Sequence, residues 1–275
     1  MKLVTVRTAD GLSAGRVEGE DIVLLDAPDV RALLDAQAAG GSVAESGIAV
    51  ALAAADLAPL VPSPRKIICV GLNYRNHILE MGRELPEAPT LFAKFDRSLI
   101  GPRDDIRLPP ESSRVDWEVE LTAVIGRSVR RAGPDEARAA IAGWTVANDI
   151  SMREWQKRTL QWLQGKTFEA STPVGPWLVT ADELDASDLA VTCEVNGAVM
   201  QTSRTSELVF DPVELVSYIS TIITLDPGDL ILTGTPGGVG DARTPPVFLQ
   251  AGDVVRTTVE GIGSLLNSCV AESAH

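Results

Sequence analysis

The chain has 275 residues, of which 45% are apolar, so it can bury the core of one large domain or of one domain with a small appendage. Asp and Glu number 38 against 24 Lys and Arg, which gives a formal net charge of −14 at pH 7. This charge repels the phosphate backbone of nucleic acid, so we expect no nucleic-acid partner.

The sequence shows no segment that predicts a membrane span or a secretory signal. The longest apolar stretch, residues 47–61, is interrupted by Asp56 and is too short to cross a bilayer. The first residues alternate like a strand and lack the apolar region of a signal peptide. We therefore expect a cytoplasmic protein with no membrane partner. Three widely spaced cysteines (Cys69, Cys193 and Cys269) are expected to be reduced and buried.

Residues 2–8 and 21–26 alternate like strands, and helical patterns follow at 29–38 and 48–57. Asp29 is the expected N-cap of the first helix. Three prolines in "PLVPSPRK" then indicate an extended linker. We predict a small N-terminal α+β domain over residues 1–62 and a catalytic domain over 63–275.

From residue 66 onward short strands outnumber helices and do not alternate with them regularly. Strand patterns lie at 66–72, 115–126, 141–149, 176–180, 189–197, 229–234 and 253–261, and helical patterns at 75–83, 134–140, 151–161 and 211–223. Asn196-Gly197 lies between two alternating runs, which is a strong hairpin signal. The pattern predicts a β-rich α+β fold with a mixed β-sandwich or roll rather than a doubly wound parallel sheet.

In "VDWEVELTAVIG", residues 115–126, Glu118 and Glu120 share one face of a strand because side chains at i and i+2 point the same way. Two such carboxylates repel unless a cation lies between them, and oxygen ligands suit Mg²⁺, Mn²⁺ or Ca²⁺. Asp149, directly after an apolar strand, is a candidate third ligand. The alternatives are a solvent-facing strand edge for the two glutamates and an ordinary N-cap for Asp149.

His77 is the only histidine besides the terminal His275, and Glu80 follows it at i+3, so the two share a helix face. A carboxylate beside an imidazole favours activation of water, although an incidental surface pair is the alternative. Lys94 and Lys166 lie among aromatic, Gly and Pro residues and could each stabilise an oxyanion, unless they are surface residues. The backbone amides and Thr235 of the glycine-rich loop 226–240 could hold a carboxylate, or the loop could be a plain turn.

Taken together, these segments resemble the fumarylacetoacetate hydrolase family over residues 66–270. The matching stretches are "GLNYRNHILEMG", "FAKFDRSLIGP", "VDWEVELTAVIG", "ANDISMREWQ", "GKTFEASTPVGPWLV" and "LDPGDLILTGTPGGVG", in the family's order. One departure is Glu169, where the family usually has Asp after "GKTF".

The resemblance implies a β-rich roll that forms a homodimer, and Mg²⁺ or Mn²⁺ bound by Glu118, Glu120 and Asp149. It implies a His77–Glu80 dyad on a lid, and an oxyanion-stabilising Lys166. Substrate contacts are expected from Arg153, Gln156, Thr235, Lys94 and Tyr74.

The chemistry implied is metal-dependent hydrolysis of a carbon–carbon bond in acylpyruvates, with fumarylpyruvate as the first candidate, in aromatic catabolism. The small-molecule partner is thus a keto acid. Alternatives within the family are decarboxylation of oxaloacetate and isomerisation or hydration of a hydroxydienoate. An inactive binding or structural relative is the alternative from another class, but all the expected site residues are present.

Overall fold

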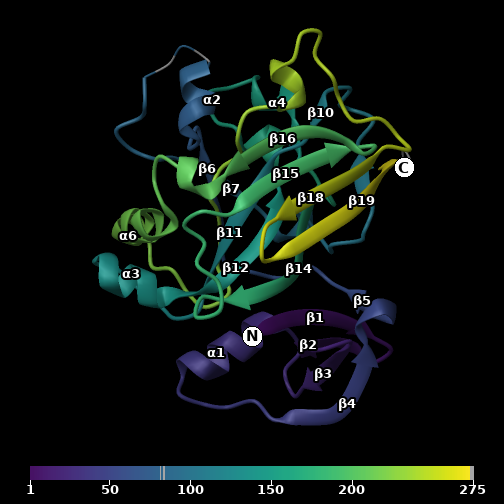
Figure 1. The fold of residues 1–275 in the computed structure, drawn as a ribbon, viewed down its shortest axis with the longest axis vertical. Helices are drawn as coiled ribbons and strands as arrows, with labels where there is room; N and C mark the ends of the chain where they lie inside the picture. The colour runs from purple at the N-terminus through teal and green to yellow at the C-terminus, as the bar shows by residue number, and fades with distance from the viewer. Residues whose placement is uncertain (81, 83, 273–275) are drawn as a thin grey trace.

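A computed structural model describes residues 1–80, 82 and 84–272, without the side chains of His77 and Glu80. Within these residues the chain forms a large mixed sheet, a smaller sheet packed across part of it, and short helices around both (Figure 1). The β-rich α+β class predicted from the sequence is confirmed.

The large sheet runs through both halves of the chain. In spatial order its strands are β4 (Glu45–Ala51), β3 (Asp21–Leu25), β2 (Gly11–Glu18), β1 (Lys2–Thr8), β14 (Thr172–Thr180), β12 (Ile141–Asn148), β11 (Val119–Ile125), β17 (Leu230–Leu232), β6 (Ile67–Gly71) and β7 (Thr90–Lys94). Two short strands pair beside this path, β5 (Asp56–Leu57) with β1 and β8 (Leu99–Ile100) with β14.

The smaller sheet packs on the large one and encloses the main core. Its strands are β16 (Ala198–Arg204), β15 (Ala190–Val195), β18 (Val254–Val259), β19 (Gly263–Ala271) and β9 (Ile106–Leu108). Leu121 and Val146 of the large sheet share one buried cluster with Val191 and Val255 of the smaller sheet. A separate ribbon pairs β10 (Val115–Asp116) with β13 (Ser151–Met152). Strands β11 and β12 therefore form the packed floor on which the site is built.

The helices are short and lie at the edges of the sheets. They are α1 (Val30–Ala38), α2 (Arg75–Glu80), α3 (Pro134–Ala140), α4 (Arg153–Gln156), α5 (Leu163–Lys166) and α6 (Pro212–Ile222), with 3₁₀ turns at Leu52–Ala54, Asp96–Ser98, Thr205–Glu207 and Gly240–Ala242. Asp29 caps α1 by accepting from Ala32 N, and Asp211 caps α6 by accepting from Val213 N and Glu214 N. In the described part of the chain, none of the helices has the length and apolarity to cross a membrane.

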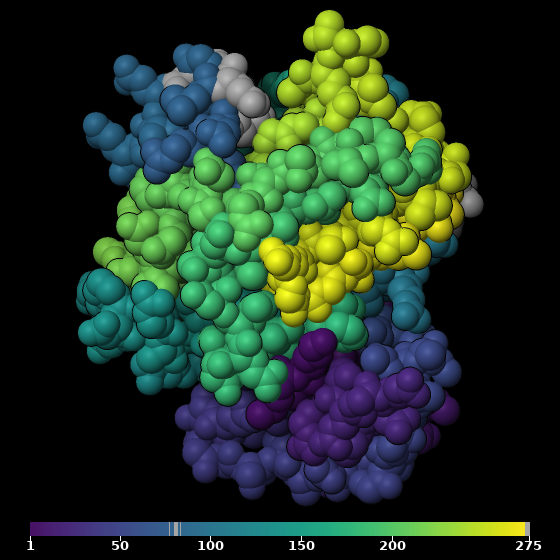
Figure 2. All heavy atoms as spheres, viewed as in Figure 1, coloured from purple at the N-terminus to yellow at the C-terminus, as the bar shows by residue number. Residues whose placement is uncertain are grey.

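The N-terminal residues form a lobe at one end of the molecule (Figure 2). The lobe is joined to the rest by strand pairing, because β1 lies antiparallel to β14 with Lys2 opposite Val179 and Leu3 opposite Leu178. Helix α1 adds apolar contacts, since Leu33 and Leu34 belong to the same buried cluster as Leu178. The division into domains at residue 62 stays a prediction.

Most predicted elements are present, but one predicted helix is wrong. Residues 48–57 form β4, a 3₁₀ turn and β5 instead, because β4 extends the sheet with Val50 opposite Ile22 and Ala51 opposite Asp21. The β-branched Ile48 and Val50 suit a strand better than a helix. The helix predicted at 151–161 is likewise shorter, covering only α4. The Asn196-Gly197 hairpin is confirmed, with positive φ at both residues.

Candidate metal centre

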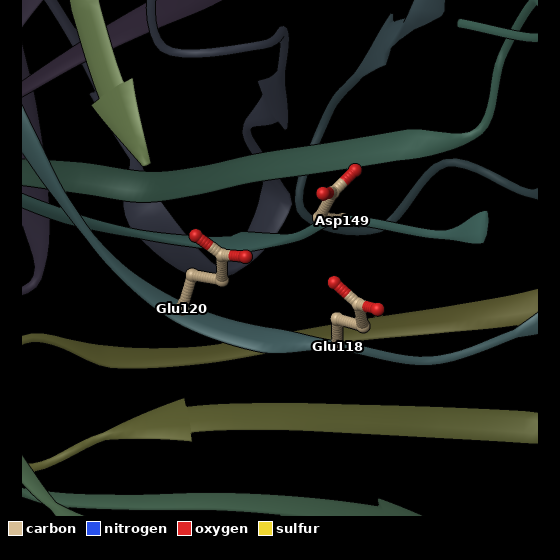
Figure 3. Close-up of side chains that lie close together, drawn as sticks. All are labelled: Glu118, Glu120 and Asp149. Atoms are coloured by element: carbon tan, nitrogen blue, oxygen red, sulfur yellow. The ribbon is translucent and has the colours of Figure 1, made fainter. Parts of the chain in front are cut away.

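Three carboxylates predicted as metal ligands lie together at the junction of β11 and β12. Glu118 precedes β11, Glu120 lies on it and Asp149 directly follows β12; all three are buried. One potential ligand atom from each lies within 4.8 Å of the others. Figure 3 shows the three side chains pointing toward one another. The backbone fixes this arrangement, because Asp149 N donates to Glu118 O at 2.9 Å.

Two buried lysines balance part of this negative charge. Lys166 Nζ lies 2.7 Å from both Glu118 Oε2 and Asp149 Oδ2, and Lys94 Nζ lies 2.6 Å from Asp149 Oδ1. Burial lowers the pKa of Lys166, but Asp149 and Glu118 outweigh burial, so its pKa is raised. Burial raises the pKa of Asp149, but Lys166 and Lys94 outweigh it, so that pKa is lowered. Asp149 is therefore held as a carboxylate by two ammonium groups.

Glu120 shows that the site still lacks positive charge. Burial, followed by repulsion from Asp149 and Glu118, raises its pKa well above the usual value. Glu120 Oε2 accepts a hydrogen bond from Gly234 N at 2.7 Å, which does not offset these effects. A hard divalent cation prefers several carboxylate oxygens and would supply the missing charge. The buried Glu-Glu-Asp group therefore fits a divalent metal ion.

A fourth buried carboxylate, Asp116, organises the residues around the triad. Its Oδ2 accepts from Arg153 Nε at 2.8 Å and from Asp241 N at 2.9 Å, and its Oδ1 accepts from Gly240 N at 2.7 Å. Arg153 Nη1 also lies 2.7 Å from Glu118 Oε1. Asp116 therefore ties the loop after β17 to the arginine that contacts the triad.

Sequence reasoning did not assign Asp116 to the site. The available signal was its place two residues before Glu118 in the same alternating acidic pattern. The glycine-rich loop does hold carboxylates through its amides, as expected, but they are the protein's own: Gly234 N binds Glu120, and Gly240 N binds Asp116.

A cavity of about 410 Å³ opens beside the triad. Its polar wall contains Glu118, Lys166, Arg153, Gln156 and Thr235, so four predicted catalytic or substrate-binding residues line the same space as one predicted ligand. Gln156 Oε1 accepts from Arg153 Nη1 at 3.0 Å. Thr235 Oγ1 accepts from Gln201 Nε2 at 2.8 Å.

The lining of the cavity also has an apolar part. It contains Leu72, Phe92, Leu160, Trp162 and Val239. Phe92 and Trp162 meet edge to face, with ring centroids 5.5 Å apart. The cavity therefore offers both anion-binding groups and apolar surface.

Helices α4 and α5 approach closely enough to bring Arg153 and Lys166 into this one cavity. The close approach depends on Gly165, where an added Cβ would lie 2.3 Å from Gln156 N and 2.6 Å from Met152 O. A side chain at residue 165 would therefore push the two helices apart.

Two of the remaining predicted site residues lie outside the lining of this cavity. Lys94 and Tyr74 do not line this cavity: Lys94 is buried against Asp149, and Tyr74 belongs to the main core. Burial, followed by the charge of Glu120, raises the pKa of Tyr74. His77 and Glu80 lie on α2, but their side chains are outside the described part of the chain. Glu169 forms an exposed ion pair with Arg97, away from the triad.

Comparisons with known proteins identify the family of this chain. Residues 66–270 match the family model described as fumarylacetoacetate (FAA) hydrolase C-terminal. The chain belongs to the fumarylacetoacetate hydrolase family. The family resemblance noted in the sequence is thereby confirmed.

Three members of the fumarylacetoacetate hydrolase family illustrate what the chain is similar to. It is 48% identical to mitochondrial oxaloacetate tautomerase Fahd2a of Rattus norvegicus over 216 residues, which is 78% of this chain and 69% of the relative. A structure of 5-carboxymethyl-2-hydroxymuconate delta-isomerase from Mycobacterium smegmatis has 38% identity and a TM-score of 0.83, covering 100% of both chains. A fumarylacetoacetate hydrolase from Exiguobacterium antarcticum has 34% identity and a TM-score of 0.88, covering 99% of this chain and 100% of that one.

These family members bear on the predicted cellular location and on the predicted reaction. The predicted cytoplasmic location is wrong by this comparison, because the tautomerases from Rattus norvegicus, Bos taurus and Homo sapiens are named as mitochondrial proteins. The names of the relatives describe enzymes, and they favour the predicted alternatives, chemistry on oxaloacetate and isomerisation, over hydrolysis of fumarylpyruvate.

Proposed function

We propose that this protein catalyses keto–enol isomerisation of small 2-oxo acids, with oxaloacetate as the first substrate to test. One observation carries the proposal: a buried arginine with an unpaired donor lies beside a carboxylate triad, on the wall of a cavity. Within the described residues, Arg153 Nη2 is buried and has no hydrogen-bond partner, while Nη1 and Nε are held by Glu118 and Asp116. The names of the tautomerase and isomerase relatives support the same reaction class.

The free donor of Arg153 suits the C1 carboxylate of a 2-oxo acid. A buried donor without a partner costs about 1–3 kcal/mol, so a carboxylate that accepts from Nη2 removes a penalty as well as forming a charge-assisted hydrogen bond. The hydroxyl of Thr235 accepts from Gln201, so its own proton is available for a substrate oxygen. These contacts fix the orientation of the substrate in the cavity.

Glu118, Glu120 and Asp149 would hold a divalent cation, which would supply Lewis-acid polarisation of the 2-oxo group. Lys166 Nζ lies against two of these carboxylates and lines the cavity, so it donates toward the 2-oxo oxygen as negative charge develops there. Interconversion then needs one proton moved: the C3–H bond forms as the enol O–H bond breaks, or the reverse.

We assign the proton transfer at C3 to His77. Its helix, α2, begins three residues after Leu72, which lines the cavity. An imidazole can both give and accept a proton, which isomerisation in either direction requires. Apolar Phe92 and Trp162 line the cavity and would limit access of water to the bound substrate, which would reduce loss of its proton to solvent.

Hydrolysis of an acylpyruvate is the second candidate. The specific observation in its favour is the similarity over 99% of the chain to the Exiguobacterium antarcticum fumarylacetoacetate hydrolase. The same dyad of His77 and Glu80 would then take a proton from water instead of from C3. The homodimer and the keto-acid partner stay predictions under either function.

The experiment supplies purified protein with Mg²⁺ or Mn²⁺ and freshly dissolved enol oxaloacetate. We expect faster loss of enol absorbance than the same metal gives alone. A coupled lactate dehydrogenase assay measures pyruvate, which separates isomerisation from decarboxylation, and a parallel assay with fumarylpyruvate tests hydrolysis.

Two matched variants complete the experiment. Glu120→Gln removes one triad carboxylate and should abolish the metal-dependent rate, whereas Glu169→Gln changes an exposed carboxylate and should leave the rate unchanged. The proposal is wrong if the wild-type protein does not accelerate enol loss above the metal-only rate.

A further inference from the structure

The lining of the cavity contains a third cation, Lys157, which the proposed function does not use. Lys157 follows α4, lines the cavity and is half-exposed. Its Nζ lies 2.5 Å from Asp241 Oδ2, and Asp241 lines the same space. Because Arg153 and Lys157 are four residues apart, they lie on the same side of this helical turn, about 6 Å apart along its axis.

Asp241 is paired with a second cation besides Lys157. Arg114 Nη2 lies 2.5 Å from its other oxygen, Oδ1. Burial raises the pKa of Asp241, but Lys157, Arg153 and Arg114 outweigh burial, so its pKa is lowered. The backbone of Asp241 is also fixed, because its N–H donates to buried Asp116. Asp241 thus keeps its ion pair with Arg114 and its backbone hydrogen bond to Asp116 when Lys157 moves away.

The other cavity cations are already committed to the inner site. Lys166 is held by Glu118 and Asp149, and Arg153 by Glu118 and Asp116. Both are almost fully buried, whereas the Lys157 side chain is 55% exposed and can rotate. Among the described residues that line the cavity, Lys157 is the cation that can leave its ion-pair partner at little cost in free energy.

We propose that Lys157 binds the second carboxylate of a 2-oxo dicarboxylate and makes the site select such substrates over 2-oxo acids with an apolar tail. This inference rests on the proposed function. Arg153 Nη2 binds the C1 carboxylate at the inner end, and Lys157 moves from Asp241 to the distal carboxylate one helical turn away. The spacing suits a short chain such as a four-carbon diacid. Without this lysine, the nearby Leu160 and Trp162 leave an outer wall that suits an apolar tail.

The test compares Lys157→Met with two controls. Lys157→Arg keeps the charge. Arg158→Met removes a neighbouring charge whose guanidinium lies over the Trp155 ring and does not line the cavity. Enol oxaloacetate is the dicarboxylate substrate, and the enol of phenylpyruvate is the monocarboxylate with an apolar tail. Circular dichroism melting curves establish that each variant is folded.

For Lys157→Met we expect a KM for oxaloacetate at least about tenfold higher, as loss of one charge-assisted hydrogen bond gives, with a KM for phenylpyruvate unchanged or lower. Lys157→Arg should retain most of the preference for oxaloacetate over phenylpyruvate, and Arg158→Met should retain all of it. An equal change for both substrates, or no change for oxaloacetate, overturns the inference.

A binding measurement separates this inference from the proposed function. Calorimetry of the metal-loaded protein compares malate with lactate, two 2-hydroxy acids that differ in the distal carboxylate and cannot enolise. Wild-type protein should bind malate more tightly, and Lys157→Met should lose about tenfold in malate affinity but none for lactate. If the enol assays fail and this difference holds, the proposed function fails and the role of Lys157 stands. If malate binds no more tightly than lactate, the role of Lys157 is wrong.

Discussion

Replacing Asp116 by Asn tests whether this buried carboxylate holds the site together. The substitution keeps the shape of the side chain and exchanges one oxygen for an NH₂ group. If that group replaces Oδ2, it faces two donors, Arg153 Nε and Asp241 N, and both hydrogen bonds are lost. In the other amide orientation the donors lost are Gly240 N and Trp117 N.

The expected loss of stability follows from burial of the Asp116–Arg153 ion pair. Asp116 is fully buried and Arg153 is nearly so. Removing one partner of a buried ion pair costs about 3–5 kcal/mol, because the other charge is left uncompensated. Arg153 keeps Glu118, so we expect a loss in free energy of unfolding near the lower end, about 3 kcal/mol.

Urea denaturation followed by circular dichroism measures this loss, at saturating Mg²⁺ and again with chelator. Asp188→Asn is the matched control, because Asp188 forms an exposed ion pair with Arg204 and should change the stability little. In enol assays Asp116→Asn should also raise the KM for oxaloacetate, since Arg153 and the loop with Asp241 lose their common anchor. A loss below about 1 kcal/mol would refute the idea that Asp116 organises the site.

Three further predictions follow from the same structure. Chelator should remove activity, and re-added Mg²⁺ or Mn²⁺ should restore it. Metal at about 100 times its Kd should raise the free energy of unfolding by about 2.7 kcal/mol. Full activity after chelation would contradict the metal site. Gly165→Ala should strongly lower the melting temperature, because the added Cβ would meet the backbone of α4. Gly133→Ala should not, because there is open space where its Cβ would lie. Equal melting temperatures for the two variants would be inconsistent with the close approach of α4 and α5. The hydrogen bond from Lys66 lowers the pKa of Asp226, so the unfolded state binds more protons and the pair stabilises the fold above the ordinary Asp pKa of about 3.9. The stability cost of Asp226→Asn, measured by urea denaturation, should therefore be present at pH 7 and disappear as the pH falls below the folded-state pKa; a cost independent of pH would rule this out.

Local signals in the sequence predicted the elements that local interactions determine. Asp29 caps α1 and Asn196-Gly197 forms the hairpin between β15 and β16, and both are readable from neighbouring residues. Residues 48–57 were predicted wrongly because the Ala-rich pattern is helical on its own, and only pairing of β4 with β3 decides the outcome. Tertiary context overrode local preference there.

The same distinction applies to the site. The triad was predictable because two ligands lie two residues apart at the start of β11 and the third directly follows the neighbouring strand β12. The role of Asp116 was not, because its partners Gly240 and Asp241 lie more than a hundred residues away in the sequence. Lys94 was expected to contact substrate, and its position against Asp149 likewise depends on how β7 lies across the sheet.

The pairing of β1 with β14 has a consequence for truncation. Strand β14 lies between β12, which ends next to Asp149, and β1. A shortened protein that starts near residue 62 would uncover the N–H and C=O groups of β14 that now face Lys2 and Leu3. Bare strand edges of this kind recruit other chains, so such a protein would self-associate even though it retains every carboxylate of the metal centre. The first strand thus protects the fold from aggregation while contributing no atom to the chemistry.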